Sequence, residues 1–130
     1  MTQKNIEIMD TIVDAMIEGE KISQALKRVY SKRNVVVRCS TKILETPITE
    51  LHLSARAENS LIRGKVKTIN DVTVYTEKNS IMNIKNLGKS SALELFEAIL
   101  DYCWDYMDND ERTTFLIDVV QRNEEYILTN

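Results

Sequence analysis

The chain has 130 residues, 43% of them apolar, and a formal net charge of −3 at pH 7. This length suits one compact domain, or one small domain with helical extensions. Three Gly and one Pro argue against long disordered linkers. No segment approaches the roughly 18 consecutive apolar residues of a membrane span, and acids interrupt the N-terminal region where a signal peptide would be apolar. We therefore expect a cytoplasmic protein without membrane contacts.

Charge is unevenly distributed along the chain. Residues 1–48 hold 8 Lys/Arg against 6 Asp/Glu, residues 49–94 hold 7 against 5, and residues 95–130 hold 2 against 9. The acidity therefore lies in the last quarter, and the remainder is mildly basic. The negative net charge of the whole chain therefore does not exclude a nucleic-acid partner.

Residue types that carry chemistry are sparse. Cys39 and Cys103 are far apart, and His52 is the only histidine. Because a closed zinc site needs about four Cys or His ligands, we expect no metal and no cofactor. Disulfides are rare in the cytosol, so both thiols are expected in the core or at its boundary. His52 has no Ser or Cys partner by spacing, and we expect no catalysis.

Two helices are predicted before residue 35. The first covers residues 3–17 and the second about 21–31, since apolar residues recur at helical spacing. Their expected apolar faces are Ile6, Met9, Val13, Met16 and Ile17 in the first, and Ile22, Leu26, Val29 and Tyr30 in the second. The cations Lys27, Arg28, Lys32 and Arg33 either cap the second helix or contact phosphate. The run Val35–Val37 favours a short strand or an extended connector.

Several helices are predicted after a connector over residues 39–50, where Pro47 disfavours a helix interior. They cover 54–62 with Ser54 as N-cap, 70–75, 78–84, 89–107, and about 111–127 after a break at Asn109–Asp110. The apolar faces of the last two are Leu93, Phe96, Leu100, Cys103, Trp104 and Met107, and Phe115, Leu116, Val119, Val120, Tyr126 and Ile127. Segments 54–69 and 79–94 are faintly alike, which suggests tandem helix-hairpin-helix-like units.

The segment around Gly88 suits phosphate binding. A Gly before a helix permits close backbone approach, and the first helical N–H groups lie at the positive end of the helix without partners inside it. Lys89, Ser90 and Ser91 add a cation and two hydroxyls, although either Ser could equally be a plain N-cap. A nucleotide-binding P-loop is rejected, because Asn83 stands where that motif needs Gly.

A second candidate segment surrounds Arg56. Arg56 and Asn59 are three residues apart, so they share one helix face. Together they could read the acceptors of a minor groove. Alternatively, Arg56 is a surface residue paired with an acid, which contributes little.

Together the two segments resemble a known family over residues 48–102. The run Leu53-Ser54-Ala55-Arg56-Ala57-Glu58-Asn59-Ser60-Leu61, the turn Thr68-Ile69-Asn70-Asp71-Val72, and the run Asn86-Leu87-Gly88-Lys89-Ser90-Ser91-Ala92-Leu93-Glu94-Leu95 stand in the family's order. The protein resembles the C-terminal domain of the bacterial RNA polymerase alpha subunit. The resemblance implies an all-α compact bundle of short helices. The resulting domain organisation is an N-terminal helical extension and connector over 1–47, this domain over 48–107, and an acidic C-terminal helix over 108–130.

The resemblance also implies a non-catalytic, DNA-binding, transcription-associated function. Carried over by position, Arg56 would enter an A·T-rich minor groove with help from Asn59. Ser60, Asn86, Gly88 and Ser91 would contact phosphates, beside Lys89 and Ser90, and Glu94 would help to orient the site. Where the family has a second Lys after Gly, this sequence has Ser90, and Asn83 replaces another frequent Lys. Each lost phosphate contact removes roughly one unit of salt slope, so one copy should bind DNA weakly.

Two further expectations concern partners. The acidic C-terminal segment favours an alternative function, a protein-interaction module that binds RNA polymerase, a sigma factor or a regulator without binding DNA. The amphipathic N-terminal helix and the valine run offer surfaces for a homodimer, which would give two weak DNA sites a joint effective concentration.

Overall fold

The computed structural model describes residues 1–31, 35, 37, 40–72 and 87–128. Its helices are α1 (Gln3–Ile17), α2 (Ile22–Val29), α3 (Ala55–Arg63), α5 (Lys89–Tyr106) and α6 (Asn109–Arg122). Short 3₁₀ turns are η1 (Thr41–Ile43), η2 (Ile48–Leu51), η3 (Ile69–Val72) and η5 (Glu124–Tyr126). Over these described ranges there is no strand beyond isolated bridges joining Tyr30 to Ile127 and Pro47 to Thr68. The predicted all-α class is confirmed.

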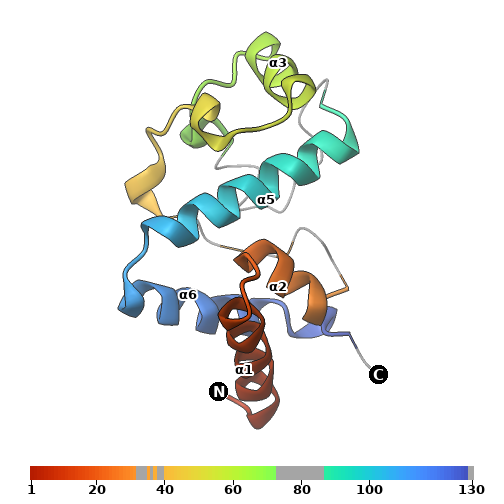
Figure 1. The fold of residues 1–130 in the computed structure, drawn as a ribbon, viewed down its shortest axis with the longest axis vertical. Coiled ribbons are helices and arrows are strands. Elements are labelled where there is room, and N and C mark those ends of the chain that lie inside the picture. Colours follow the sequence, from red (N-terminus) through yellow and green to blue (C-terminus); the bar gives the residue numbers. More distant parts are fainter. Residues whose placement is uncertain (32–34, 36, 38–39, 73–86, 129–130) are drawn as a thin grey trace.

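The long helix α5 lies in the middle of the molecule (Figure 1). It contacts α3, η1 and η2 on one side and α2 on the other, while α1 packs against α2 and α6. Figure 1 shows α3 at one end of the molecule and α1 at the opposite end. Helix α6 is also separated from α3 by α5.

A single apolar core joins the flanking helices to the middle of the protein. Its members include Ile12 of α1, Ile22 of α2, Leu61 of α3, Phe96 of α5 and Val119 of α6, each at most 2% exposed. Burial of one such residue stabilises the fold by roughly 1.5–3 kcal/mol. Packing of the N- and C-terminal helices therefore also stabilises the segment that carries the candidate site.

The predicted extent of α1 is confirmed, but its predicted apolar face is wrong. The buried positions are Asn5, Ile8, Ile12 and Ala15. Ile6, Val13 and Ile17 remain 40%, 38% and 77% exposed, and Met9 and Met16 are only partly buried. Both sets follow helical spacing, so periodicity alone could not choose between them.

Helix α2 agrees with the sequence in extent and orientation. Ile22, Leu26, Val29 and Tyr30 are all buried, as predicted. Burial raises the pKa of the Tyr30 phenol to about 12. The two described cations at its end form ion pairs, Lys27 with Glu97 at 2.9 Å and Arg28 with Glu20. This arrangement disfavours the phosphate-contact interpretation for these two residues, while Lys32 and Arg33 lie outside the described residues.

The last two helices have slightly different boundaries from those predicted. The break comes at Met107–Asp108, because the Asp108 carboxylate accepts from the Glu111 N–H at 2.8 Å and forms a capping box at the start of α6. Helix α6 ends at Arg122 rather than near residue 127, and residues 124–126 form η5. Phe115, Leu116, Val119 and Val120 are buried as predicted, as is Cys103.

Some predictions fall on residues that the structure does not describe. The predicted helix over 78–84, half of the second helix-hairpin-helix-like unit, Cys39 and Val36 are among them. Val35 and Val37 are both buried. The connector over 40–50 contains η1 and the start of η2.

Candidate nucleic-acid interface

Helix α3 presents its polar face to solvent because two of its apolar residues are held by the core, whereas Ile62 stays 56% exposed. The Ser54 hydroxyl accepts from the Ala57 N–H at 3.3 Å, which caps the helix as the sequence predicts. Ala57 and Leu61 are buried, at 0% and 1% exposure. Arg56 and Asn59 are consequently exposed, and Ser60 is half-buried. Arg56 forms no ion pair within 4 Å in the described part of the protein, so the acid-paired interpretation of Arg56 is not supported.

The start of α5 has the features of an anion-binding helix end. Leu87 is buried and anchors the backbone, and Gly88 takes the N-cap position without a side-chain cap. The first turn contains no acid, so nothing there neutralises the positive end of the helix. Lys89 and Ser90 are exposed, while Ser91 is only 8% exposed.

No described residue closes the space in front of Gly88. Among the residues that the structure describes, a Cβ atom added there would meet no atom within 4 Å. The N-cap backbone has φ −65° and ψ 159°, which any residue can adopt. Neither the fold nor the local backbone therefore requires glycine at this position. What glycine does provide is unobstructed access to the N–H groups that begin α5.

Glu94 connects the two segments. Its carboxylate accepts from the Ser54 backbone N–H and, at 2.8 Å, from the Ser54 hydroxyl. Glu94 stands in the second turn of α5, and Ser54 immediately precedes α3. This contact holds the first turn of α3, which contains Arg56, beside the beginning of α5. Asn86 lies outside the described residues.

Two further cations in this region were missed by sequence reasoning. Arg63 stands seven residues after Arg56 and donates from Nη2 to the Ser60 hydroxyl at 3.4 Å. Lys65 is exposed and has φ 62°, in the left-handed region. The seven-residue spacing from Arg56 was the available signal for Arg63, since residues i and i+7 share a helix face. No sequence pattern indicated the Lys65 backbone conformation.

The turn that follows α3 is held by Asp71. Its carboxylate accepts from the backbone N–H groups of Lys67, at 2.8 Å, and Thr68, at 3.1 Å. These hydrogen bonds lower the pKa of the Asp71 carboxyl. The Ile48 N–H donates to the Lys67 carbonyl, which ties the turn to η2.

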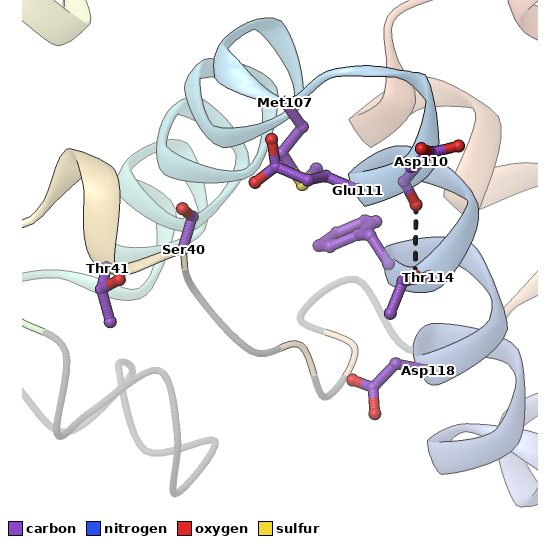
Figure 2. Close-up of a pocket in the computed structure, with 8 residues that line it drawn as sticks. Ser40, Thr41, Met107, Asp110, Glu111, Thr114 and Asp118 are labelled. Atoms are coloured by element: carbon purple, nitrogen blue, oxygen red, sulfur yellow. Dashed lines mark hydrogen bonds between the residues drawn. The ribbon is translucent and has the colours of Figure 1, made fainter.

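A second candidate surface lies at the C-terminal end of α5. A cavity of about 490 Å³ lies at the junction of α5 and α6, and Figure 2 shows the residues that line it. Its lining is Ser40, Thr41, Met107, Asp110, Glu111, Thr114, Phe115 and Asp118. Lys42 binds Glu111 at 2.8 Å, and Arg122 binds Asp118 at 2.7 Å.

Across the described ranges, no group of three or more His, Cys, Asp or Glu side chains is arranged to hold a metal. None of the described helices combines the length and apolar character needed to cross a membrane.

Comparison with known proteins places the central segment in a family. Residues 38–101 match the family model for the C-terminal domain of the bacterial RNA polymerase alpha chain. This segment belongs to that domain family. The family is transcription-associated and, in general, DNA-binding. Arg56, Asn59, Ser60, Gly88, Lys89, Ser90, Ser91 and Glu94 all lie within the matched segment.

Individual relatives agree with the family model. The DNA-directed RNA polymerase subunit alpha of Gloeobacter violaceus is 46% identical over 57 residues, which are 44% of this protein and 18% of the relative. The subunit of Synechococcus sp. (strain JA-3-3Ab) is 46% identical over 55 residues, 42% of this protein and 16% of the relative. That of Mesostigma viride is 37% identical over 70 residues, 54% of this protein and 22% of the relative. The match thus spans about a fifth of these relatives, and no solved structure gives a significant match.

Proposed function

We propose that this protein binds duplex DNA through the exposed face of α3 and the start of α5. The observation that carries the proposal is the Glu94–Ser54 contact, which holds the exposed Arg56 beside an uncapped helix N-terminus. A guanidinium suits the narrow, negative minor groove of A·T-rich DNA. Backbone N–H groups and the Lys89 ammonium suit the flanking phosphates.

In this proposal the predicted residues divide into those that contact the groove and those that contact the phosphates. Arg56 enters the groove, and Asn59, three residues further along α3, assists it. Ser60, Asn86, Lys89 and Ser90 contact phosphates. Gly88 allows the DNA backbone to come close. Because Ser91 is buried, it would contribute through its backbone N–H rather than its hydroxyl.

The net charge of −3 does not oppose this function, because six of the 20 acids lie in residues 108–125, away from α3. Residues 108–125, which hold these six acids against Arg112 and Arg122, lie on the other side of α5 from α3 (Figure 1). At physiological ionic strength the Debye length is about 8 Å, so charges farther away than that are largely screened. A nearby phosphate would therefore experience the cations of α3 and of the α5 N-terminus, together with the carboxylates of Glu58 and Glu94, rather than the acids of residues 108–125.

The test is a titration of an A·T-rich and a G·C-rich duplex at two salt concentrations. Wild-type protein should bind the A·T-rich duplex more tightly, and more weakly as salt rises. Arg56→Ala should reduce affinity by roughly tenfold or more while leaving the circular dichroism spectrum unchanged. Lys4→Ala, on α1 at the far end of the molecule, is the matched control and should bind like wild type. An absence of salt-sensitive binding by wild-type protein would overturn the proposal.

A second candidate function rests on the acid-rimmed cavity in Figure 2. Phe115 and Met107 are buried at its lining, and Asp110, Glu111 and Asp118 surround it. Glu111 and Asp118 are already paired with Lys42 and Arg122, so Asp110 is the carboxylate offered to a partner segment that carries apolar and basic side chains. RNA polymerase, a sigma factor or a regulator would be the partner. Capture of purified polymerase or sigma factor that is abolished by Asp110→Lys but not by Arg56→Ala would support this function.

Self-association stays a prediction. Ile6, Val13 and Ile17 of α1 remain exposed and would be available for it. Sedimentation of the full-length protein measures it directly.

A further inference from the structure

The cationic face of α3 continues beyond the residues that the family motif contains. Arg56, Asn59, Ser60 and Arg63 occupy positions i, i+3, i+4 and i+7, which form one stripe on a helix. Arg63 is exposed, and its contact with the Ser60 hydroxyl places it directly beside a predicted phosphate-contacting residue. The stripe therefore has a guanidinium at each end.

Lys65 extends this surface at a conformational cost. Helix α3 ends in a turn in which the Lys65 N–H donates to the Ile62 carbonyl at 3.0 Å and the Val66 N–H donates to the Leu61 carbonyl at 2.9 Å. This is the Schellman arrangement, in which the left-handed residue is usually Gly. Here Gly64 comes one residue too early, and Lys65 takes φ 62°. A non-glycine residue in this region costs on the order of 1 kcal/mol, so an ammonium group is retained where glycine would be more stable.

We infer that Arg63 and Lys65 form a second phosphate-contacting site, which grips the DNA backbone at the edge of the groove that Arg56 enters. The inference rests on the proposed function, because it uses the same face of α3. Seven helical residues separate the two arginines by about 10 Å along the axis. The minor groove of B-DNA is only about 6 Å wide, so a residue that far from the one inside the groove meets the bordering phosphates.

Arg63 and Lys65 also stand at the C-terminal end of α3, where cations stabilise a helix through its dipole. This role predicts effects on stability alone. The two roles are separable at Lys65, since Lys65→Gly removes the charge and also relieves the left-handed strain. We expect Lys65→Gly to raise the melting temperature and to weaken DNA binding at the same time. A purely structural Lys65 would show the first effect without the second.

The experiment measures affinity of the full-length protein for one A·T-rich duplex across a series of salt concentrations. Arg63→Gln and Lys65→Gly should each lower the slope of log K against log salt by roughly 0.9, and the double variant by roughly 1.8. Preference for A·T-rich over G·C-rich duplex should persist, because phosphate contacts carry no direct sequence information. Lys4→Gln, which removes the same charge from α1, should leave the slope unchanged.

The outcomes separate this inference from the function on which it rests. If Arg56→Ala weakens binding but Arg63→Gln and Lys65→Gly leave the salt slope at its wild-type value, the second phosphate site is wrong and the proposed function stands. If wild-type protein shows no salt-dependent binding, both fail. If Lys4→Gln lowers the slope as much as Arg63→Gln does, the effect reflects total charge rather than a site, and the inference is again overturned.

Discussion

Glu94 on α5 accepts two hydrogen bonds from Ser54, the residue that caps α3. The Ser54 hydroxyl therefore makes two hydrogen bonds, since it donates to Glu94 and also accepts from the Ala57 N–H. One pair of polar residues thus fixes both the beginning of a helix and its position against a second helix. The resemblance implied an orienting role for Glu94, and this contact is a physical means by which it could act.

The Ser54–Glu94 pair should show energetic coupling. Ser54→Ala should lower the free energy of unfolding by about 1 kcal/mol through loss of the cap. Glu94→Ala should have a smaller effect, because the pair is solvent-exposed. A double-mutant cycle measured by urea denaturation should reveal a non-zero interaction energy. Strict additivity of the two substitutions would show that the contact does not hold the helices together.

Gly88→Ala should separate binding from folding. The added methyl group meets no atom of the described residues within 4 Å, so the fold should tolerate it. The free energy of unfolding should change by less than about 1 kcal/mol, the scale of N-cap preferences. Duplex affinity should nevertheless fall, because the methyl group occupies the space through which a phosphate would approach. Unchanged affinity would mean that no phosphate lies against Gly88.

Two isoleucines on α1 test which face of that helix carries stability. Ile12 is 0% exposed and Ile17 is 77% exposed. Ile12→Ala should lower the free energy of unfolding by about 2–5 kcal/mol, whereas Ile17→Ala should stay within about 0.5 kcal/mol of wild type. Chemical denaturation of both variants provides the measurement. Similar losses at both positions would contradict the packing of α1 described above.

Acid should weaken the turn after α3 through Asp71. Hydrogen bonds from the Lys67 and Thr68 backbone lower its pKa below the ordinary 3.8. The stabilisation that the carboxylate provides is therefore present above that value and is lost as pH falls through the lowered pKa. Wild type should be more stable than Asp71→Asn at pH 7, and the difference should shrink below pH 3.8. Denaturation curves at several pH values would test this, and a pH-independent difference would contradict it.

Features that depend on neighbouring residues could be predicted from the sequence. The Ser54 cap, the extent of α1 and the long helix α5 follow from short-range hydrogen bonding and apolar spacing. The family segment could also be predicted from the sequence, because its two motifs lie in one continuous stretch of residues. The exposure of Arg56 also followed, because a polar residue on an amphipathic helix faces water unless it has a buried partner.

Tertiary packing alone decided the remaining features. Two faces of α1 have suitable spacing, and contact with α2 and α6 selected the one that contains Ile8 and Ile12. The Glu94–Ser54 contact joins residues 40 positions apart, and no local pattern encodes it. Lys65 adopts a left-handed backbone because Val66 is drawn back towards Leu61 and packs against the core. Local periodicity and capping thus determined where helices form, whereas burial against distant segments determined which side chains remain free to meet a partner.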